Sequence, residues 1–136
     1  MSYVDETTRG MFVAHCDDVA CGNATVTVVA KLSGRTFDPT NQDEQTSLAI
    51  GIDGLPLLLF PDDVTDPPSV AHCRDIACAA SDSIVTVDTG VFMLVGSLAI
   101  SSDGLPVIAC LWKPKRTAGA YELILAHCQN ITCAAP

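Results

Sequence analysis

The sequence predicts an all-β fold of antiparallel four-stranded units, on three observations. Ala-His-Cys, followed after four residues by another Cys, occurs at residues 14–21, 71–78 and 126–133. Ser-Leu-Ala-Ile-x-x-Asp-Gly-Leu-Pro occurs at residues 47–56 and 97–106. Runs rich in β-branched residues follow the first two cysteine motifs, and such residues favour strands over helices. Because the two motifs alternate along the chain, the repeated unit is expected to be a pair of hairpins.

The Asp-Gly motif predicts the first hairpin of each unit. A short apolar strand reaches Asp-Gly and returns through residues 57–60 or 107–110, and glycine accepts the positive φ that such a turn requires. The second hairpin has a strand ending in His-Cys, a turn of four residues, and a returning strand at residues 24–29 or 83–88. Leu57 to Phe60 lacks apolar and polar alternation, which is expected of a strand covered on both faces. No segment predicts a helix.

Residues 1–136 are therefore expected to form a single repeat domain. With its strands called A, B, C and D, residues 1–30 hold an N-terminal segment and a C-D hairpin, residues 46–88 a complete A-B-C-D unit, and residues 96–136 an A-B-C unit with a truncated D strand. Antiparallel four-stranded units that recur at about 40–50 residues are typical of β-propeller blades. About two and a half units cannot close a propeller, so oligomerisation is expected to complete the sheets.

The repeated segments also resemble a known class of sequences. Ser-Leu-Ala-Ile-x-x-Asp-Gly-Leu-Pro, followed by Val-Ala-His-Cys-x-Asp-x-Ala-Cys and Val-Thr-Val-Asp, is similar to propeller-like repeats of poorly characterised bacterial exported proteins. The resemblance spans most of residues 11–136. It implies a blade-type sheet and no known enzymatic activity.

The incomplete units predict interfaces between copies of the chain. Unpaired strand edges favour pairing with another chain, and the segment containing Tyr3, Val4 and Asp5 is the candidate donor because it echoes residues 86–89. An acidic insertion over residues 38–44 and a basic one over residues 113–116 could align a head-to-tail contact, or could be solvated loops. The remaining candidate interface residues are Asp43, Glu44, Cys110, Trp112, Lys113, Lys115 and Arg116.

Composition restricts the partners and the compartment. The net charge of −9 and the isoelectric point near 4.4 argue against nucleic acid and anionic membrane surfaces. The mean hydropathy is +0.35, yet no apolar run has the roughly 18 residues of a membrane span. The first residues do not predict a signal peptide. Six cysteines in paired spacing nevertheless favour an oxidising compartment, so an extracellular or cell-surface location is expected.

The cysteine pairs could form disulfides, bind a metal ion or remain free thiols. Four intervening residues suit a disulfide across the mouth of a hairpin, and this is the favoured interpretation. Metal binding is disfavoured because neighbouring strand residues point to opposite faces, which separates each His from its Cys, and because no fourth ligand recurs. The predicted disulfide residues are Cys16, Cys21, Cys73, Cys78, Cys128 and Cys133.

Other residues have a structural interpretation beside a functional one. The three histidines are expected to be packing residues, with ligand binding or pH sensing as the alternative. Asp53 and Asp103 are expected to be turn residues. Cys110 is predicted to fill the core, or alternatively to form an intermolecular disulfide. Trp112 is either a core residue or an interface anchor. Two sequons, at Asn23 and Asn130, are candidate glycosylation sites or chance matches.

These observations favour a structural subunit that assembles with itself by strand addition between chains, as an extracellular filament or tube. The alternative is an oligomeric propeller-type binding module for carbohydrate or protein, with its site in loops. An enzyme is not expected, because the sequence has no nucleophile with a base, no acid-base pair and no phosphate loop. No cofactor is expected.

Overall fold

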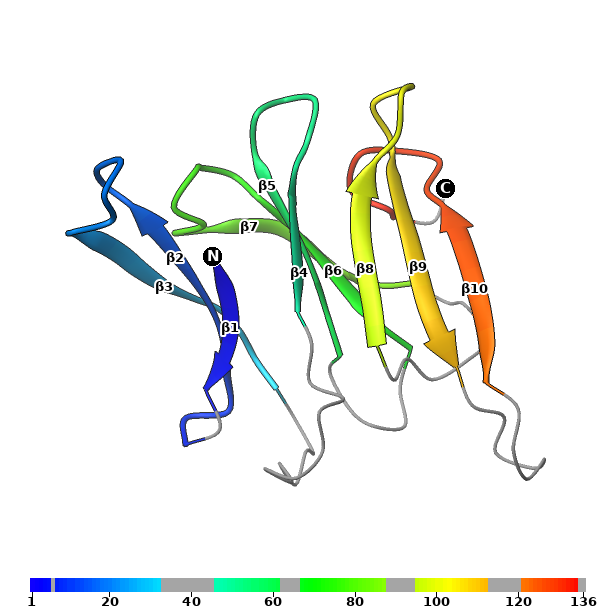
Figure 1. Ribbon diagram of the computed structural model, residues 1–136, viewed down its shortest axis with the longest axis horizontal. Coiled ribbons are helices and arrows are strands. Elements are labelled where there is room, and N and C mark those ends of the chain that lie inside the picture. Colours follow the sequence, from blue (N-terminus) through cyan, green and yellow to red (C-terminus); the bar gives the residue numbers. More distant parts are fainter. Residues whose placement is uncertain (6, 33–45, 62–66, 88–94, 113–120, 135–136) are drawn as a thin grey trace.

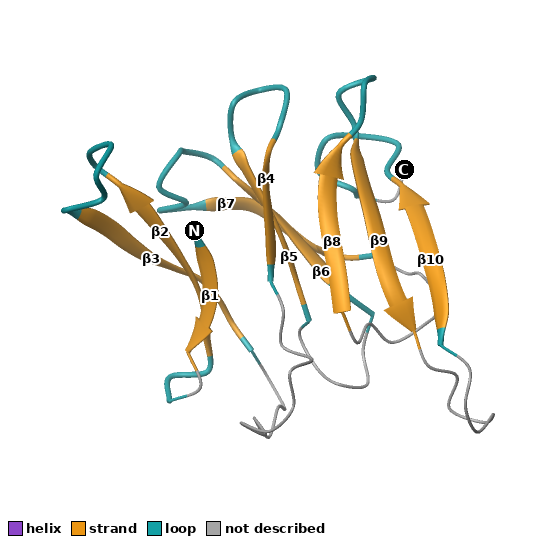
Figure 2. Cartoon of the chain, viewed as in Figure 1, coloured by secondary structure: helices purple, strands orange, loops and turns teal. Residues whose placement is uncertain are grey.

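The computed structural model describes residues 1–5, 7–32, 46–61, 67–87, 95–112 and 121–134. Within these residues there are ten strands and no helix (Figure 2). The strands form three antiparallel sheets of three, four and three strands, which follow one another in chain order without closing into a ring (Figure 1). The predicted all-β class and the antiparallel hairpins are confirmed.

The first sheet has the order β1 (Ser2–Asp5), β2 (Gly10–Cys16), β3 (Ala24–Lys31). The central sheet has the order β4 (Ser47–Ile50), β5 (Pro56–Phe60), β6 (Ser69–Cys73), β7 (Ser81–Thr86). The third sheet has β8 (Val95–Ile100), β9 (Pro106–Trp112) and β10 (Glu122–His127), with β9 in the middle. Each copy of the Ala-His-Cys motif thus lies at the end of β2, β6 or β10.

Both Asp-Gly sequences form the predicted hairpin turns. In the β4–β5 turn, the Gly51 amide donates to the Leu55 carbonyl at 2.8 Å, and the Gly54 amide donates to the Gly51 carbonyl at 3.0 Å. Gly54 has a φ of 79° and Gly104, its counterpart between β8 and β9, has a φ of 82°. A side chain at either position would strain the backbone, which explains the glycine.

The N-terminal segment lies in its own sheet, in contrast to its expected donation to another chain. β1 pairs with β2, with Ser2 opposite Val13 and Val4 opposite Met11. The Met1 amino group donates to the Ala14 carbonyl at 3.0 Å, and the Ala14 amide donates to the Met1 carbonyl. Val4 is partly buried and packs against the core beside the central sheet, so this contact and the backbone pairing both hold the segment within the chain.

Each sheet has two faces that strand alternation distinguishes. We call them the histidine face, which carries His15, His72 or His127, and the cysteine face, which carries the first cysteine of the same motif. His72 lies opposite Leu57 on β5, whereas Cys73, one residue later, packs with residues of the first sheet. The predicted separation of each His from its neighbouring Cys therefore holds in the central sheet.

Two hydrophobic clusters lie between the three sheets. The histidine face of the central sheet, with Leu57, Leu59 and Val70, packs on Ile108 and Cys110 of the third sheet. Its cysteine face packs on the first sheet through a cluster of Met11, Val13, Leu32, Leu58, Phe60, Ala71, Cys73 and Cys78. Every residue of β5 is buried, as the missing alternation predicted. In the described ranges, nothing forms a helix that could cross a bilayer.

Candidate functional site

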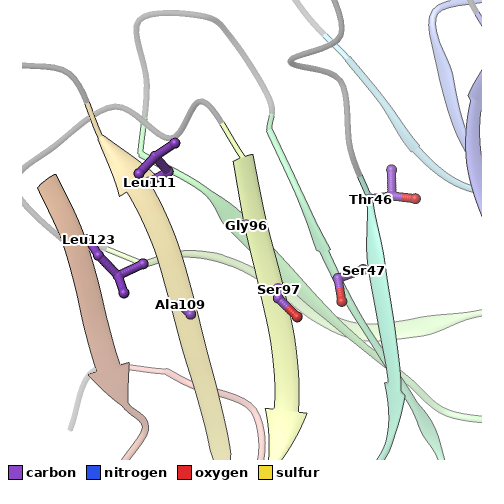
Figure 3. Close-up of a pocket in the computed structure, with 7 residues that line it drawn as sticks. All are labelled: Thr46, Ser47, Gly96, Ser97, Ala109, Leu111 and Leu123. Atoms are coloured by element: carbon purple, nitrogen blue, oxygen red, sulfur yellow. The ribbon is translucent and has the colours of Figure 1, made fainter. Parts of the chain in front are cut away.

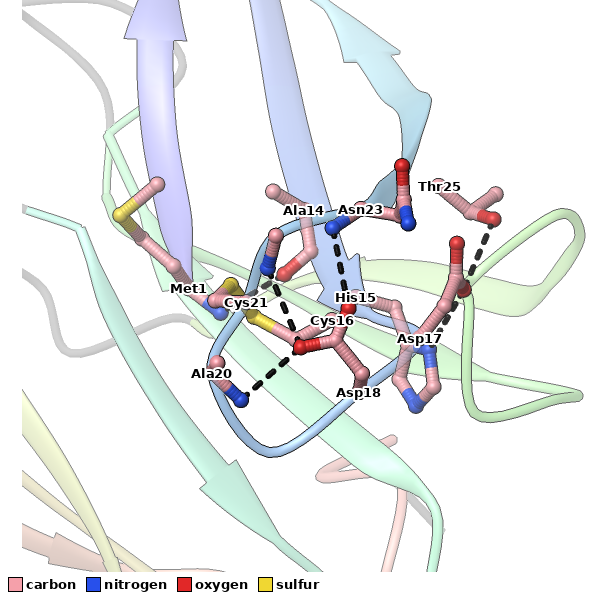
Figure 4. The surroundings of a disulfide bond; sticks show 11 residues. Met1, Ala14, His15, Cys16, Asp17, Asp18, Ala20, Cys21, Asn23 and Thr25 are labelled. Carbon is pink, nitrogen blue, oxygen red and sulfur yellow. Dashed lines mark hydrogen bonds and ion pairs between the residues drawn. A yellow bond between two sulfur atoms is a disulfide. The ribbon is translucent and has the colours of Figure 1, made fainter.

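Three disulfides close the hairpin corners that the cysteine motifs predicted. Cys16 bonds to Cys21, Cys73 to Cys78 and Cys128 to Cys133, with Cα atoms 4.8, 4.9 and 4.9 Å apart. These bonds are compatible with an oxidising environment outside the cell. We call the three segments the disulfide corners, and Figure 4 shows the first of them.

The same hydrogen-bonded loop forms each disulfide corner. The side chain two residues after the first cysteine accepts hydrogen bonds from backbone amides of the corner. This acceptor is Asp18, Asp75 or Asn130. Asp18 Oδ1 accepts from the amide of Ala20 (Figure 4) and from that of Gly22, and the other two acceptors bind the corresponding amides in their corners. The second cysteine of every corner has a positive φ of 55° or 56°. These side chains therefore hold a backbone conformation that residues other than glycine rarely adopt.

The acceptors differ in charge. Hydrogen bonds from the amides of Gly22 and Asn23 hold the pKa of Asp18 below its usual value, because they stabilise the carboxylate. Asn130, the third acceptor, does not titrate. Its Nδ2 donates to the Ala134 carbonyl at 2.7 Å, and attachment of a glycan would replace one of the two hydrogens of this nitrogen. Asn23, in the other sequon, is exposed.

Two histidines are held by the aspartates of the Asp-Gly turns, and we call these pairs the Asp–His clamps. In the central sheet, Asp53 Oδ2 lies 2.8 Å from His72 Nε2, and the two side chains are 27% and 4% exposed. In the third sheet, Asp103 Oδ2 lies 3.0 Å from His127 Nε2, and both side chains are about half exposed. Each clamp joins the Asp-Gly turn of one hairpin to the end of the strand that follows this hairpin, which is β6 or β10.

The aspartates of the clamps remain ionised at lower pH than usual. Burial disfavours the carboxylate of Asp53, but hydrogen bonds from the Leu55 amide and His72 outweigh burial and lower its pKa. The pKa of Asp103 is lowered by the Ser101 hydroxyl and the Leu105 amide, with a smaller effect of His127. The predicted turn role of Asp53 and Asp103 is confirmed, and the histidine contact is added to it.

Ser101, Asp103 and His127 do not have the geometry of a catalytic triad. Ser101 Oγ lies 3.5 Å from His127 Nε2, the same nitrogen that faces Asp103, and the Ser101 hydroxyl also donates to Asp103. In a triad the serine and the aspartate bind different nitrogens of the imidazole, so that one group orients the base and the other gives up a proton. The cluster resembles the other clamp, where Gly51 replaces the serine.

The two outermost faces of the molecule expose apolar side chains. On the histidine face of the third sheet, Leu123 and Leu125 are 74% and 70% exposed. On the cysteine face of the first sheet, Val26 and Val28 are about half exposed, and Tyr3 stacks on Phe12 with ring centroids 5.4 Å apart. Exposed apolar patches of this kind are common at contact surfaces.

Each outer face also has a hollow. The hollow beside the outer face of the third sheet, between that sheet and the start of β4, has a volume of about 360 Å³, and Figure 3 shows its lining residues: Thr46, Ser47, Gly96, Ser97, Ala109, Leu111 and Leu123. It offers hydroxyl groups and aliphatic side chains, and its lining contains no aromatic ring. The hollow on the first sheet is lined by Thr8, Gly10, Phe12, Val28 and Lys31.

The candidate interface residues have different outcomes. Tyr3 lies on an outer face, whereas Val4 is partly buried against the core and Asp5 accepts hydrogen bonds from Thr8. Cys110 is a buried free thiol, and burial raises its pKa to about 11, which favours core filling over an intermolecular disulfide. Trp112 ends β9. The five remaining candidate interface residues lie outside the described residues: Asp43, Glu44, Lys113, Lys115 and Arg116.

The chain matches no protein-family model, and neither curated proteins nor solved structures provide a match.

Sequence reasoning missed two features of these sites. The Asp–His clamps were signalled by the aspartate of the Asp-Gly turn and the histidine of the next cysteine motif, which recur in the central and third sheets. The two residues of each clamp are 19 or 24 positions apart in the sequence. The acceptors of the disulfide corners were signalled by the polar residue two positions after each first cysteine. That Asn130 belongs to this set was hidden by its place in a sequon.

Proposed function

We propose that the chain is a structural subunit that assembles with copies of itself outside the cell, and that a strand added along β10 extends its third sheet. The supporting observation is a comparison of β10 with β6. Both strands carry the Ala-His-Cys motif, and β6 lies between β5 and β7, whereas β10 has β9 as its neighbour within the described part of the chain. Among the described residues, no strand pairs with the second edge of β10, and the backbone groups of such an edge are suited to pairing with another strand.

The disulfides and the apolar surfaces support the same role. Three disulfides stabilise hairpins in an oxidising compartment, where extracellular structural proteins function. Two strongly exposed leucines on β10 leave apolar area that association would bury. A carbohydrate-binding module is less well supported, because the hollow in Figure 3 lacks the aromatic side chains that commonly bind sugar rings.

Assembly is tested on the non-reduced full chain by light scattering and electron microscopy over a wide range of concentration. We expect particles larger than the 14.2 kDa monomer, with a mass that rises with concentration. Hydrogen exchange then identifies the paired edge, because amides of β10 that exchange freely in dilute protein should become protected on assembly. A monomer at every concentration would exclude the assembly role. Assembly without new protection in β10 would exclude strand addition there.

A further inference from the structure

The two contacts between sheets follow one rule. The histidine face of the first sheet meets the cysteine face of the central sheet, and the histidine face of the central sheet meets the cysteine face of the third sheet. In each contact, the disulfide of the later sheet is buried against the earlier one. Cys73 and Cys78 are 0% and 2% exposed, and Cys128 and Cys133 are 8% and 9% exposed.

One face of each kind remains uncovered by the described residues. The cysteine face of the first sheet is open, and both Cys16 and Cys21 are exposed there. The histidine face of the third sheet is open at the other end of the molecule (Figure 1). Leu125, which occupies on β10 the position that Val70 occupies on β6, is 70% exposed, whereas Val70 is fully buried.

We propose that the histidine face of the third sheet docks onto the cysteine face of the first sheet of a second copy. This inference rests on the proposed assembly role and specifies which surfaces meet; strand addition along β10 follows the docking, so a copy that cannot dock is expected to stay monomeric. The partner is a second copy because the chain itself carries both halves of a contact that it already makes twice internally. Leu123, Leu125 and the hollow of Figure 3 face Phe12, Val28 and the Cys16–Cys21 disulfide of the neighbouring copy.

The docking is head to tail, because the two surfaces differ and lie at opposite ends of the chain's row of sheets. Every docked copy thus presents another free face of each kind. Such a heterologous contact continues until it closes into a ring or extends as a filament. A contact of this kind also explains how apolar surface on both end sheets is removed from water.

The test uses one blocking lysine on each face. Val28→Lys places a charge on the cysteine face of the first sheet, and Leu125→Lys places one on the histidine face of the third. Both side chains are at least half exposed, so neither change should unfold the monomer. Val19→Lys is the matched control: Val19 is fully exposed, and Ile76, its counterpart in the central sheet, remains 57% exposed although the first sheet packs beside that corner.

We expect each blocked variant alone to sediment as a monomer, with self-association weakened at least tenfold, and Val19→Lys to assemble like the unmodified protein. An equimolar mixture of Val28→Lys and Leu125→Lys should form one heterodimer and nothing larger, because one intact face of each kind remains. Circular dichroism and thermal unfolding check that each variant is folded. If the unmodified chain assembles but the mixture stays monomeric, or if either variant alone still assembles, the docking is wrong and the assembly role stands. A monomeric unmodified chain would refute both.

Discussion

The disulfides Cys73–Cys78 and Cys16–Cys21 close the same motif on corresponding strands, yet the first is buried between two sheets and the second is exposed. The Asp–His clamps differ in the same way. His72, on the face of the central sheet that packs on the third sheet, is nearly inaccessible, and His127 is half exposed. The shared motif therefore produces similar local geometry, whereas the neighbouring sheet decides how far each interaction is buried.

The largest difference in stabilisation is expected between the buried disulfide Cys73–Cys78 and the exposed disulfide Cys16–Cys21. Both loops have a sequence separation of 5, so replacing either pair by alanine should lose about 2 kcal/mol of loop-closure stabilisation. The Cys73→Ala/Cys78→Ala variant should lose a further 1–2 kcal/mol or so, because it also leaves a cavity in the core. Urea unfolding of the two double variants measures this. Equal losses would show that burial adds nothing to the central disulfide.

Corresponding positions on β6 and β10 give the next comparison. Val70→Ala removes two buried methyl groups and should lower the free energy of unfolding by about 2 kcal/mol. Leu125→Ala removes a larger part of a side chain, but from an exposed position. It should change the free energy of unfolding of the monomeric protein by less than about 0.5 kcal/mol. Urea unfolding at low concentration compares them. A large effect of Leu125→Ala under these conditions would mean that β10 is already covered in the monomer.

The Asp–His clamps should differ by a smaller amount. Asp53→Asn keeps an acceptor for the Leu55 amide but loses the charged partner of buried His72, and should cost about 1 kcal/mol. Asp103→Asn makes the same change where Asp103 and His127 are both half exposed, and should lower the free energy of unfolding much less. Thermal unfolding near pH 6 compares the variants. Equal shifts in Tm would indicate that burial does not strengthen the central clamp.

The smallest expected effect is a difference between the first and third disulfide corners in how their contribution to stability depends on pH. The pKa of Asp18 is lowered in the folded protein, so its stabilisation is present above the unfolded value near 3.8 and is lost as the pH falls through the lower folded value. Asp5, Asp53 and Asp103 add to this dependence in the same direction. Asp18→Asn, which copies the third corner, should therefore reduce the loss of Tm between pH 5 and pH 2. An unchanged pH profile would contradict this account.

Much of the local structure could be predicted from the sequence. The Asp-Gly turns, the cysteine pairs and the β-branched runs fix hairpins through interactions within about 25 residues. The place of the N-terminal segment could not be predicted in this way. It pairs with β2, and its Val4 packs against the core beside the central sheet, which is a contact distant in sequence, whereas its sequence echo of residues 86–89 suggested pairing with another chain.

The sequence by itself determined the strand alternation that separates every His of the motif from the Cys beside it, since side chains on a strand point alternately to its two faces. Only the tertiary structure decided which copies of those faces are buried. The central sheet has a neighbour on both sides, and each end sheet has one neighbour among the described residues. Burial depends on contacts between strands that are distant in sequence, so identical motifs became core at one position and surface at another.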